Sequence, residues 1–154
     1  MDASDYYESL RAKVGAELIY VPSTAAVIRN ENNEILFLKA ENGEWDLPTG
    51  AMEPGETPSQ SLIRKVWEET GLNIQPIQLQ GVFTGKDFRH TYENGNQVEY
   101  VMLCFECVVR GGRLDAGALE AGNLAYYSSC EIPQLVLPYP DSLFADFDHS
   151  ASFF

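Results

Sequence analysis

The stretch Gly50–Leu72, GAMEPGETPSQSLIRKVWEETGL, decides the fold of this chain, because it contains a loop followed by a clearly delimited helix. Thr57 is a good N-cap, Pro58 suits the first helical position, and Gln60 completes a capping box with Thr57. Gly71 suits the left-handed conformation that ends many helices. The sequence therefore predicts a helix between Thr57 and Gly71.

This helix has two different faces when its residues are placed at 100° intervals. We expect one face to pack into a core, and it carries Leu62, Ile63, Val66, Trp67 and Thr70. The other face is charged and carries Arg64, Lys65, Glu68 and Glu69, with Lys65 between the two glutamates in projection. Two neighbouring carboxylates are usually part of a solvated helix face, so the pair alone does not indicate a metal site.

The spacing of the charged residues resembles the Nudix box, the signature of the Nudix (MutT-like) hydrolases, G-x5-E-x7-R-E-U-x-E-E-x-G-U with U a bulky aliphatic residue. Eight of its nine fixed positions match in register: Gly50, Glu56, Arg64, Val66, Glu68, Glu69, Gly71 and Leu72. The ninth is Lys65, where the box has Glu. The resemblance implies an α/β (α+β) fold, a Nudix-type α/β/α sandwich with a mixed β-sheet. It extends less specifically to 10–40, 45–48 and the hairpin around Asn94.

The resemblance also implies a chemistry. Hydrolysis of a diphosphate linkage needs an in-line water and neutralisation of the phosphate oxygens, which Mg²⁺ (or Mn²⁺) can provide. These ions prefer carboxylate, carbonyl and water oxygens. The implied metal ligands in this chain are Glu68, Glu69 and the carbonyl of Thr49, and the implied catalytic residues are Arg64, Lys65, Glu68 and Glu69. The resemblance also implies structural roles within the box for Gly50, Glu56 and Gly71. Arg64 is expected to stabilise the loop as well.

A further metal ligand is expected outside the box. Members of the family place a glutamate about six residues before an aromatic pair, and Glu120 precedes Tyr126–Tyr127 at that spacing. A solvated loop glutamate is the alternative interpretation of Glu120. Glu99 is a second candidate ligand, although a strand residue that faces solvent is the better interpretation.

Lys65 leaves the reaction open, because it places a cation where the family has a metal-binding glutamate. The protein can work with fewer metal ions, or Lys65 can act as a fixed positive charge toward phosphate oxygens. Alternatively, catalysis is lost and the site survives as a nucleotide-binding module. Lys65 can also simply pair with Glu68 or Glu69.

The composition of the chain limits the possible domain organisation, partners and cellular location. With 154 residues, 45% of them hydrophobic, the chain is expected to form a single domain over 1–154, with a helix over about 4–14 and a tail over about 140–154. The formal charge of −13 argues against a nucleic-acid polymer as partner. No apolar run suits a membrane span, and the first residues lack the basic start of a signal peptide, so a cytoplasmic location is expected.

Three cysteines form no disulfide framework. Cys104 and Cys107 make a C-x-x-C, yet they lie in a run typical of a strand, where residues three apart point to opposite faces. Structural roles for both are therefore favoured over a redox or zinc site.

The remaining elements follow from periodicity and turn residues. Strands are predicted over 24–29, 34–39, 77–84, 88–92, 98–109 and 124–128, and a short helix over 142–147. Asn94–Gly95 predicts a hairpin turn. Residues near this hairpin are candidates for substrate binding, either as cations or as aromatic platforms: Arg89, His90 and Tyr92.

Two functions are weighed against each other. The first is a divalent-metal-dependent hydrolase of a nucleoside diphosphate linked to another group. The second is a weak or inactive Nudix-fold module that binds a nucleotide-like ligand. In both, the partner is a small phosphorylated molecule, and a homodimer is possible. A third interpretation, an unrelated acidic domain with a chance motif, would be excluded by Mg²⁺ or Mn²⁺ binding that depends on Glu68.

Overall fold

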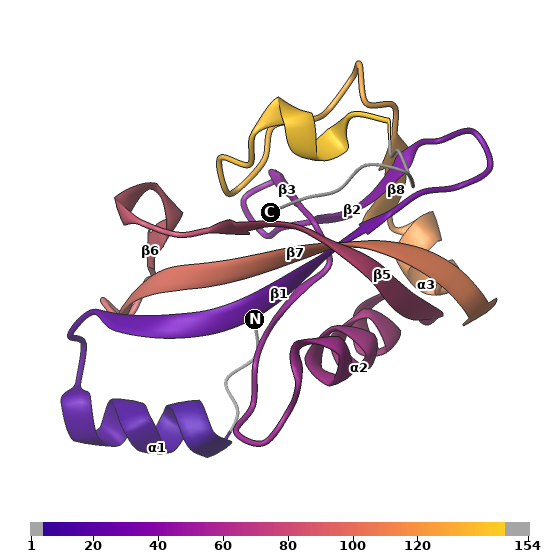
Figure 1. Ribbon diagram of the computed structural model, residues 1–154. Helices are drawn as coiled ribbons and strands as arrows, with labels where there is room; N and C mark the ends of the chain where they lie inside the picture. Colours follow the sequence, from indigo (N-terminus) through magenta and orange to yellow (C-terminus); the bar gives the residue numbers. More distant parts are fainter. Residues whose placement is uncertain (1–4, 147–154) are drawn as a thin grey trace.

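A five-stranded mixed sheet forms the centre of the protein (Figure 1), as seen in a computed structural model that describes residues 5–146. Its strands are β1 (Ile19–Ile28), β4 (Thr49–Ala51), β5 (Leu72–Phe83), β6 (Arg89–Thr91) and β7 (Gln97–Gly112). The order is β4-β1-β7-β5, and β6 also pairs with β7. β1 and β7 run parallel and the other pairs run antiparallel. The predicted mixed sheet is therefore confirmed, and β4 lies at its edge.

A second, three-stranded antiparallel sheet has the order β3-β2-β8. Its strands are β2 (Ile35–Lys39), β3 (Trp45–Asp46) and β8 (Leu124–Tyr127). A large core joins the two sheets: Val27 of β1, Phe37 of β2 and Met102 of β7 are all fully buried in it. The C-terminal segment, which includes the 3-10 helix η2 (Asp141–Phe144), covers this side of the molecule (Figure 1).

The helix α2 (Pro58–Thr70) lies on the other face of the central sheet (Figure 1). Its predicted ends are confirmed: Thr57 is the N-cap, the capping box with Gln60 is formed, and Gly71 ends the helix with φ 81°. The remaining helical elements are α1 (Asp5–Val14), η1 (Lys86–Phe88) and α3 (Ala116–Glu120). No helix within residues 5–146 has the length and apolar character needed to cross a membrane.

The predicted faces of α2 are partly wrong. The sequence predicts Trp67 in the core, yet this residue is 56% exposed. It predicts Lys65 on the charged surface, yet Lys65 is only 8% exposed. The buried arc consists of Ser61, Leu62, Lys65, Val66 and Thr70. The helix is rotated in this way because the sheet beneath Lys65 presents a glycine, which leaves room for a long aliphatic stem.

Several element bounds also differ from the predictions. β5 starts at Leu72, directly after the helix, and contains Pro76 and register shifts that hide its strand pattern. Residues 86–88 form η1, so only 89–91 of the strand predicted over 88–92 is a strand. The short strands β3 and β4 and the helix α3 were not predicted, and the late helix is a 3-10 helix. Residues 147–154, part of the predicted tail and of the predicted late helix, lie outside the described residues.

Candidate functional site

The contact between Gly50 and Lys65 joins strand β4 to helix α2. A Cβ atom added at Gly50 would stand 2.5 Å from Cγ and 2.8 Å from Cβ of Lys65. The lysine stem therefore runs across the glycine with no space to spare, and any other residue at position 50 would displace it. This contact packs α2 against the strand that contains Thr49.

The Lys65 ammonium group lies near one of the two glutamates. Its Nζ is 3.9 Å from Oε2 of Glu68, and Nη1 of Arg64 is 3.7 Å from Oε1 of the same carboxylate. Both ion pairs are long, and the Glu68 side chain is half exposed. Neither contact therefore fixes Glu68 in one position. Glu68 is thus an accessible carboxylate between two cations.

Arg64 ties the preceding loop to the helix. Its Nε donates to Oε2 of Glu56 at 2.8 Å and its Nη2 donates to Oε1 at 3.1 Å. Oε1 of Glu56 also accepts from the backbone N–H of Glu53, which closes the loop upon itself. The hydrogen bonds from Arg64 hold the pKa of Glu56 below its usual value, so this carboxylate is charged at neutral pH.

The predicted metal ligands are not brought together as one cluster. Glu68 and Glu69 share a face of α2 and Thr49 lies in β4, whereas Glu120 is an exposed residue at the end of α3. Within residues 5–146, no group of three or more His, Cys, Asp or Glu side chains could hold a metal ion. Two carboxylates and a carbonyl fit one Mg²⁺ that completes its shell with water and substrate phosphates. They do not fit a preformed site for several ions.

A pocket of about 600 Å³ lies on the other side of β4, and we name it the Asp46 pocket. Its walls come from β3, β4, β6, β7 and three loops: Ala40, Glu41, Asn42, Asp46, Thr49, His90, Thr91, Tyr92, Glu93, Tyr100, Met102, Val136 and Leu137. Two of the predicted substrate-binding residues, His90 and Tyr92, therefore line a pocket that also contains Thr49.

The third predicted substrate-binding residue, Arg89, does not line this pocket. Its Nε instead donates to Oε1 of Glu99 at 2.7 Å. Glu99 is only 5% exposed, so its interpretation as a strand residue facing solvent is wrong. Burial is tolerated because the arginine accompanies the carboxylate, and the same pairing leaves Glu99 poorly placed to bind a metal.

Asp46 is a pocket residue that sequence reasoning missed. Its Oδ1 is fully buried and, within residues 5–146, has no hydrogen-bond partner. Burial raises the pKa of the carboxyl group to about 7, although the backbone N–H of Leu47 partly opposes the shift. A single Asp beside Trp45 carries no spacing signal in the sequence, apart from its place just before the box.

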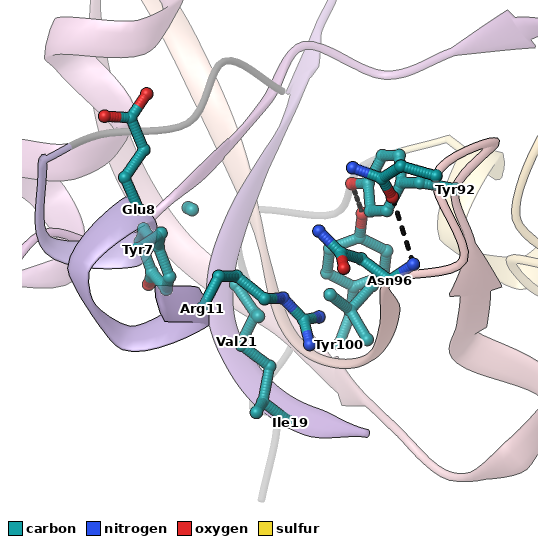
Figure 2. A pocket seen from close by; sticks show the side chains of 11 residues that line it. Tyr7, Glu8, Arg11, Ile19, Val21, Tyr92, Asn96 and Tyr100 are labelled. Carbon is teal, nitrogen blue, oxygen red and sulfur yellow. Dashed lines mark hydrogen bonds between the residues drawn. The ribbon is translucent and has the colours of Figure 1, made fainter. Parts of the chain in front are cut away.

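A second pocket, of about 400 Å³, lies between α1, β1 and the β6–β7 hairpin (Figure 2). Tyr92 and Tyr100 line both pockets, and their hydroxyl groups are hydrogen-bonded at 2.6 Å. Arg11 lines the second pocket, but its guanidinium group donates to the backbone carbonyls of Gly15, Glu17 and Gln97. Arg11 therefore anchors α1.

The two cysteines of the C-x-x-C lie on opposite faces of β7. Cys104 belongs to the core between the sheets and Cys107 to the core beneath α2, so the predicted structural roles are confirmed. Burial raises the pKa of both thiols far above the usual value, which leaves them unreactive.

Comparison with known proteins gives a consistent family. The family described as NUDIX domain matches residues 19–141. A MutT-like protein of Streptomyces ambofaciens is 37% identical over 91 residues, which are 58% of this chain and 53% of that protein. An uncharacterised Nudix hydrolase of Bacillus subtilis (strain 168) is 32% identical over 126 residues, 80% of this chain and 76% of that protein.

Solved structures share the fold. The crystal structure of an ADP-ribose pyrophosphatase from Streptococcus suis aligns with a TM-score of 0.60 at 21% identity and covers 81% of this chain and 87% of that chain. At this identity the likeness concerns the fold alone. This chain spans only about half the length of its Streptomyces relative.

Proposed function

Since the chain belongs to the Nudix family of hydrolases, we propose that it is a divalent-metal-dependent enzyme that cleaves the diphosphate linkage of a nucleoside diphosphate joined to another group. One observation supports this proposal: Lys65 of α2 packs against Gly50 of β4, so the helix that bears Glu68 and Glu69 lies against the strand that contains Thr49. The three oxygen donors proposed for Mg²⁺ thus come from two consecutive elements, β4 and α2.

The residues present have distinct tasks under this proposal. Glu68, Glu69 and the Thr49 carbonyl would hold the Mg²⁺ (or Mn²⁺), which would neutralise phosphate charge and make its bound water more acidic. Glu56 and Arg64 keep the loop against α2 through two short hydrogen bonds. Lys65 supplies a positive charge near the phosphate oxygens without a further ion. Glu120 stays a predicted ligand.

A second candidate function is favoured by one specific observation. Lys65 stands where the family has a metal-binding glutamate, and its ammonium group lies near Glu68. Such a cation competes with a metal ion for the carboxylate. The site would then bind the phosphates of a nucleotide-like ligand through Lys65 and the loop, with little or no turnover.

The setting proposed for this activity is the cytoplasm. All three cysteines, Cys104, Cys107 and Cys130, are free thiols, as is usual for proteins in a reducing compartment. The substrate is a small phosphorylated molecule, because a formal charge of −13 opposes long polyanions. A homodimer stays a prediction, to be tested by measuring the mass of the protein in solution.

The test is a phosphate-release assay with Mg²⁺ and with Mn²⁺ over nucleoside triphosphates, ADP-ribose, nucleotide sugars and dinucleotide polyphosphates. We expect wild-type protein to hydrolyse at least one class and Glu68→Gln to lower its kcat at least 100-fold. Glu31→Gln, in the exposed turn between β1 and β2, is the matched control and is expected to be fully active.

Lys65→Glu separates the two candidate functions. A faster variant would show that the lysine weakens an enzyme that still assembles, and a slower variant would show that the lysine has been recruited for the reaction. If neither protein turns over any substrate while a nucleotide raises the Tm of the wild type, the binding-module function replaces the enzymatic one.

A further inference from the structure

Helix α1 is connected to the loop of the Nudix box by a hydrogen bond from Tyr7. The Tyr7 hydroxyl donates to the carbonyl of Met52 at 2.6 Å, although the two residues are 45 positions apart in the sequence. The ring of Tyr7 packs against the core between the two sheets. Burial, together with the charge of Glu53, raises the pKa of Tyr7 to about 12, so the hydroxyl keeps its proton at neutral pH. The Met52 carbonyl therefore has a permanent donor on α1.

Arg11 holds the other end of α1. No residue of this helix is fully buried, so apolar packing fixes it only weakly. The guanidinium group of Arg11, in the last turn, donates to the backbone carbonyls of Gly15, Glu17 and Gln97. Tyr7 and Arg11 both line the second pocket (Figure 2). The helix is thus held by one polar side chain in its first turn and another in its last turn.

Met52 is fixed from two sides at the start of the loop. It directly follows β4, the strand that contains Thr49. Its N–H donates to the carbonyl of Pro22 in β1 at 2.9 Å, and its own carbonyl accepts the Tyr7 hydroxyl. The peptide groups on both sides of Met52 are therefore hydrogen-bonded, one to the sheet and one to α1. Loss of the Tyr7 hydroxyl removes the bond on the side where the loop continues toward α2.

Side-chain contacts continue this connection from the loop to Glu68. The N–H of Glu53 belongs to the same rigid peptide group as the Met52 carbonyl, and it donates to Oε1 of Glu56 at 2.9 Å. Nε of Arg64 donates to Oε2 of Glu56 at 2.8 Å, and Nη1 of Arg64 lies 3.7 Å from Oε1 of Glu68. One peptide group and two side chains thus join the donor on α1 to a predicted metal ligand.

Glu68 depends on its neighbours for its position. Its side chain is half exposed, and its ion pairs with Arg64 and Lys65, at 3.7 Å and 3.9 Å, are long. Mg²⁺ requires ligand atoms at about 2.0–2.1 Å in a near-ideal octahedral arrangement. A displacement of roughly 1 Å is therefore enough to impair such a site. Any contact that keeps the loop and Arg64 in place also acts on Glu68.

We propose that Tyr7 is a positioning residue for Glu68 and acts through the peptide group between Met52 and Glu53. This inference rests on the proposed function, because it assumes that Glu68 binds Mg²⁺ or Mn²⁺. It gives α1 a role in the metal site, although the helix lies outside residues 19–141, which match the family.

The test measures the binding of Mn²⁺ alone by electron paramagnetic resonance, so neither substrate nor turnover is needed. Tyr7→Phe keeps the ring in the core and removes only the hydroxyl. We expect this variant to raise the Kd for Mn²⁺ roughly three- to tenfold, the range that corresponds to the loss of one hydrogen bond. Tyr6→Phe removes a hydroxyl from a neighbouring residue that is 47% exposed, and it should leave the Kd unchanged.

A double variant tests whether Tyr7 acts through the loop. Tyr7→Phe and Glu56→Ala remove the hydrogen bonds at the two ends of the same peptide group. If both residues orient that group, their effects on the Kd are coupled, and the double variant binds Mn²⁺ more tightly than the product of the two single effects predicts. Tyr7→Phe combined with Glu31→Gln, in the exposed turn between β1 and β2, should show multiplicative effects.

Excess metal distinguishes a positioning role from a general loss of structure. For a substrate that the wild type hydrolyses, we expect Tyr7→Phe to lower kcat at a Mn²⁺ concentration near the wild-type Kd. Saturating Mn²⁺ should restore most of the lost activity, because mass action compensates for a weaker metal site.

Three results would overturn the inference: an unchanged Kd in Tyr7→Phe, multiplicative effects of Tyr7→Phe and Glu56→Ala, or a fall in kcat that saturating Mn²⁺ leaves in place. If Tyr7→Phe does not fold, Arg11→Lys loosens the other end of α1 without a change in charge, and an unchanged Kd in that variant would count against the inference. Wild-type protein that binds no Mn²⁺ would instead overturn the proposed function, on which the inference rests.

Discussion

Lys65 lies across Gly50 so closely that a Cβ atom at position 50 would stand 2.5 Å from the lysine Cγ. This contact explains two features that otherwise look unrelated. A glycine is needed in an edge strand that has a regular backbone, and a lysine is buried to 8% exposure on a helix face that looks fully charged in sequence. The contact fixes α2 against β4, while the ammonium group stays within 4 Å of Glu68.

Gly50→Ala is expected to destabilise the protein by about 1–3 kcal/mol, because the added methyl group overpacks a buried contact and forces the Lys65 stem to move. Urea denaturation measures the free energy of unfolding. Gly111→Ala is the control, since a Cβ at that position meets no atom within 4 Å and the φ angle is not positive. Equal stability losses in the two variants would contradict this packing argument.

Glu56→Gln is expected to lower the free energy of unfolding by about 1 kcal/mol at pH 7, because it removes a charge-assisted pair with Arg64 that solvent partly screens. The pKa of Glu56 is lowered in the folded state, so its contribution is present above the usual value of 4.5 and is lost as the pH falls through the folded-state pKa. Denaturation curves of wild type and variant should therefore converge in acid. Glu31→Gln, at an exposed turn position, should show no such pH-dependent difference.

The effect of Asp46 on the free energy of unfolding is expected to depend on pH in the opposite direction to that of Glu56. Its pKa is raised from 3.8 to about 7 by burial, so its favourable contribution is fully present below pH 3.8 and is lost as the pH rises through 7. Asp46→Asn avoids this loss. Its free energy of unfolding, relative to wild type, should rise by as much as ~4 kcal/mol between pH 4 and pH 8. Parallel pH profiles for the two proteins would refute the buried, ionisable state of Asp46, and Asp87→Asn should run parallel to wild type.

Tyr7→Phe is expected to loosen the loop of the Nudix box. The Tyr7 hydroxyl donates to the Met52 carbonyl at 2.6 Å and ties α1 to this loop, and its burial raises its pKa to about 12. Loss of one such hydrogen bond costs about 1 kcal/mol. Hydrogen exchange of the loop amides should therefore accelerate several-fold. Tyr6→Phe is the control, because Tyr6 is 47% exposed, and equal exchange in both variants would count against a tether through Tyr7.

Some of this fold could be predicted because its causes are local. The capping residues Thr57 and Gln60, the stop at Gly71 and the hairpin at Asn94–Gly95 depend on neighbours in the chain, and each is found where it was expected. The strands β3 and β4 could not be predicted, since they have only two and three residues and are defined by their pairing with β2 and β1. α3 was also missed, although Asp115 caps it in a recognisable way.

The same difference between local and long-range causes applies to the candidate site. Its position was readable from the spacing of Glu56, Arg64, Glu68 and Glu69, and the pairing of Arg64 with Glu56 follows from a loop that returns to its own helix. The ion pair between Arg89 and Glu99 could not be predicted, because it depends on the register in which β6 pairs with β7. Asp46 carried no signal in sequence, because its burial depends on strands and loops that meet only in the folded state.

The sequence alone determined the family resemblance, the helix with its caps, and the presence of a cation among the expected metal ligands, because these depend on residue identity and spacing. Only the tertiary structure decided that Lys65 is buried over Gly50 and that the pocket beside β4 contains an unpartnered carboxylate oxygen. The physical reason is that burial and desolvation depend on which distant strands cover a residue, and no local pattern records those neighbours.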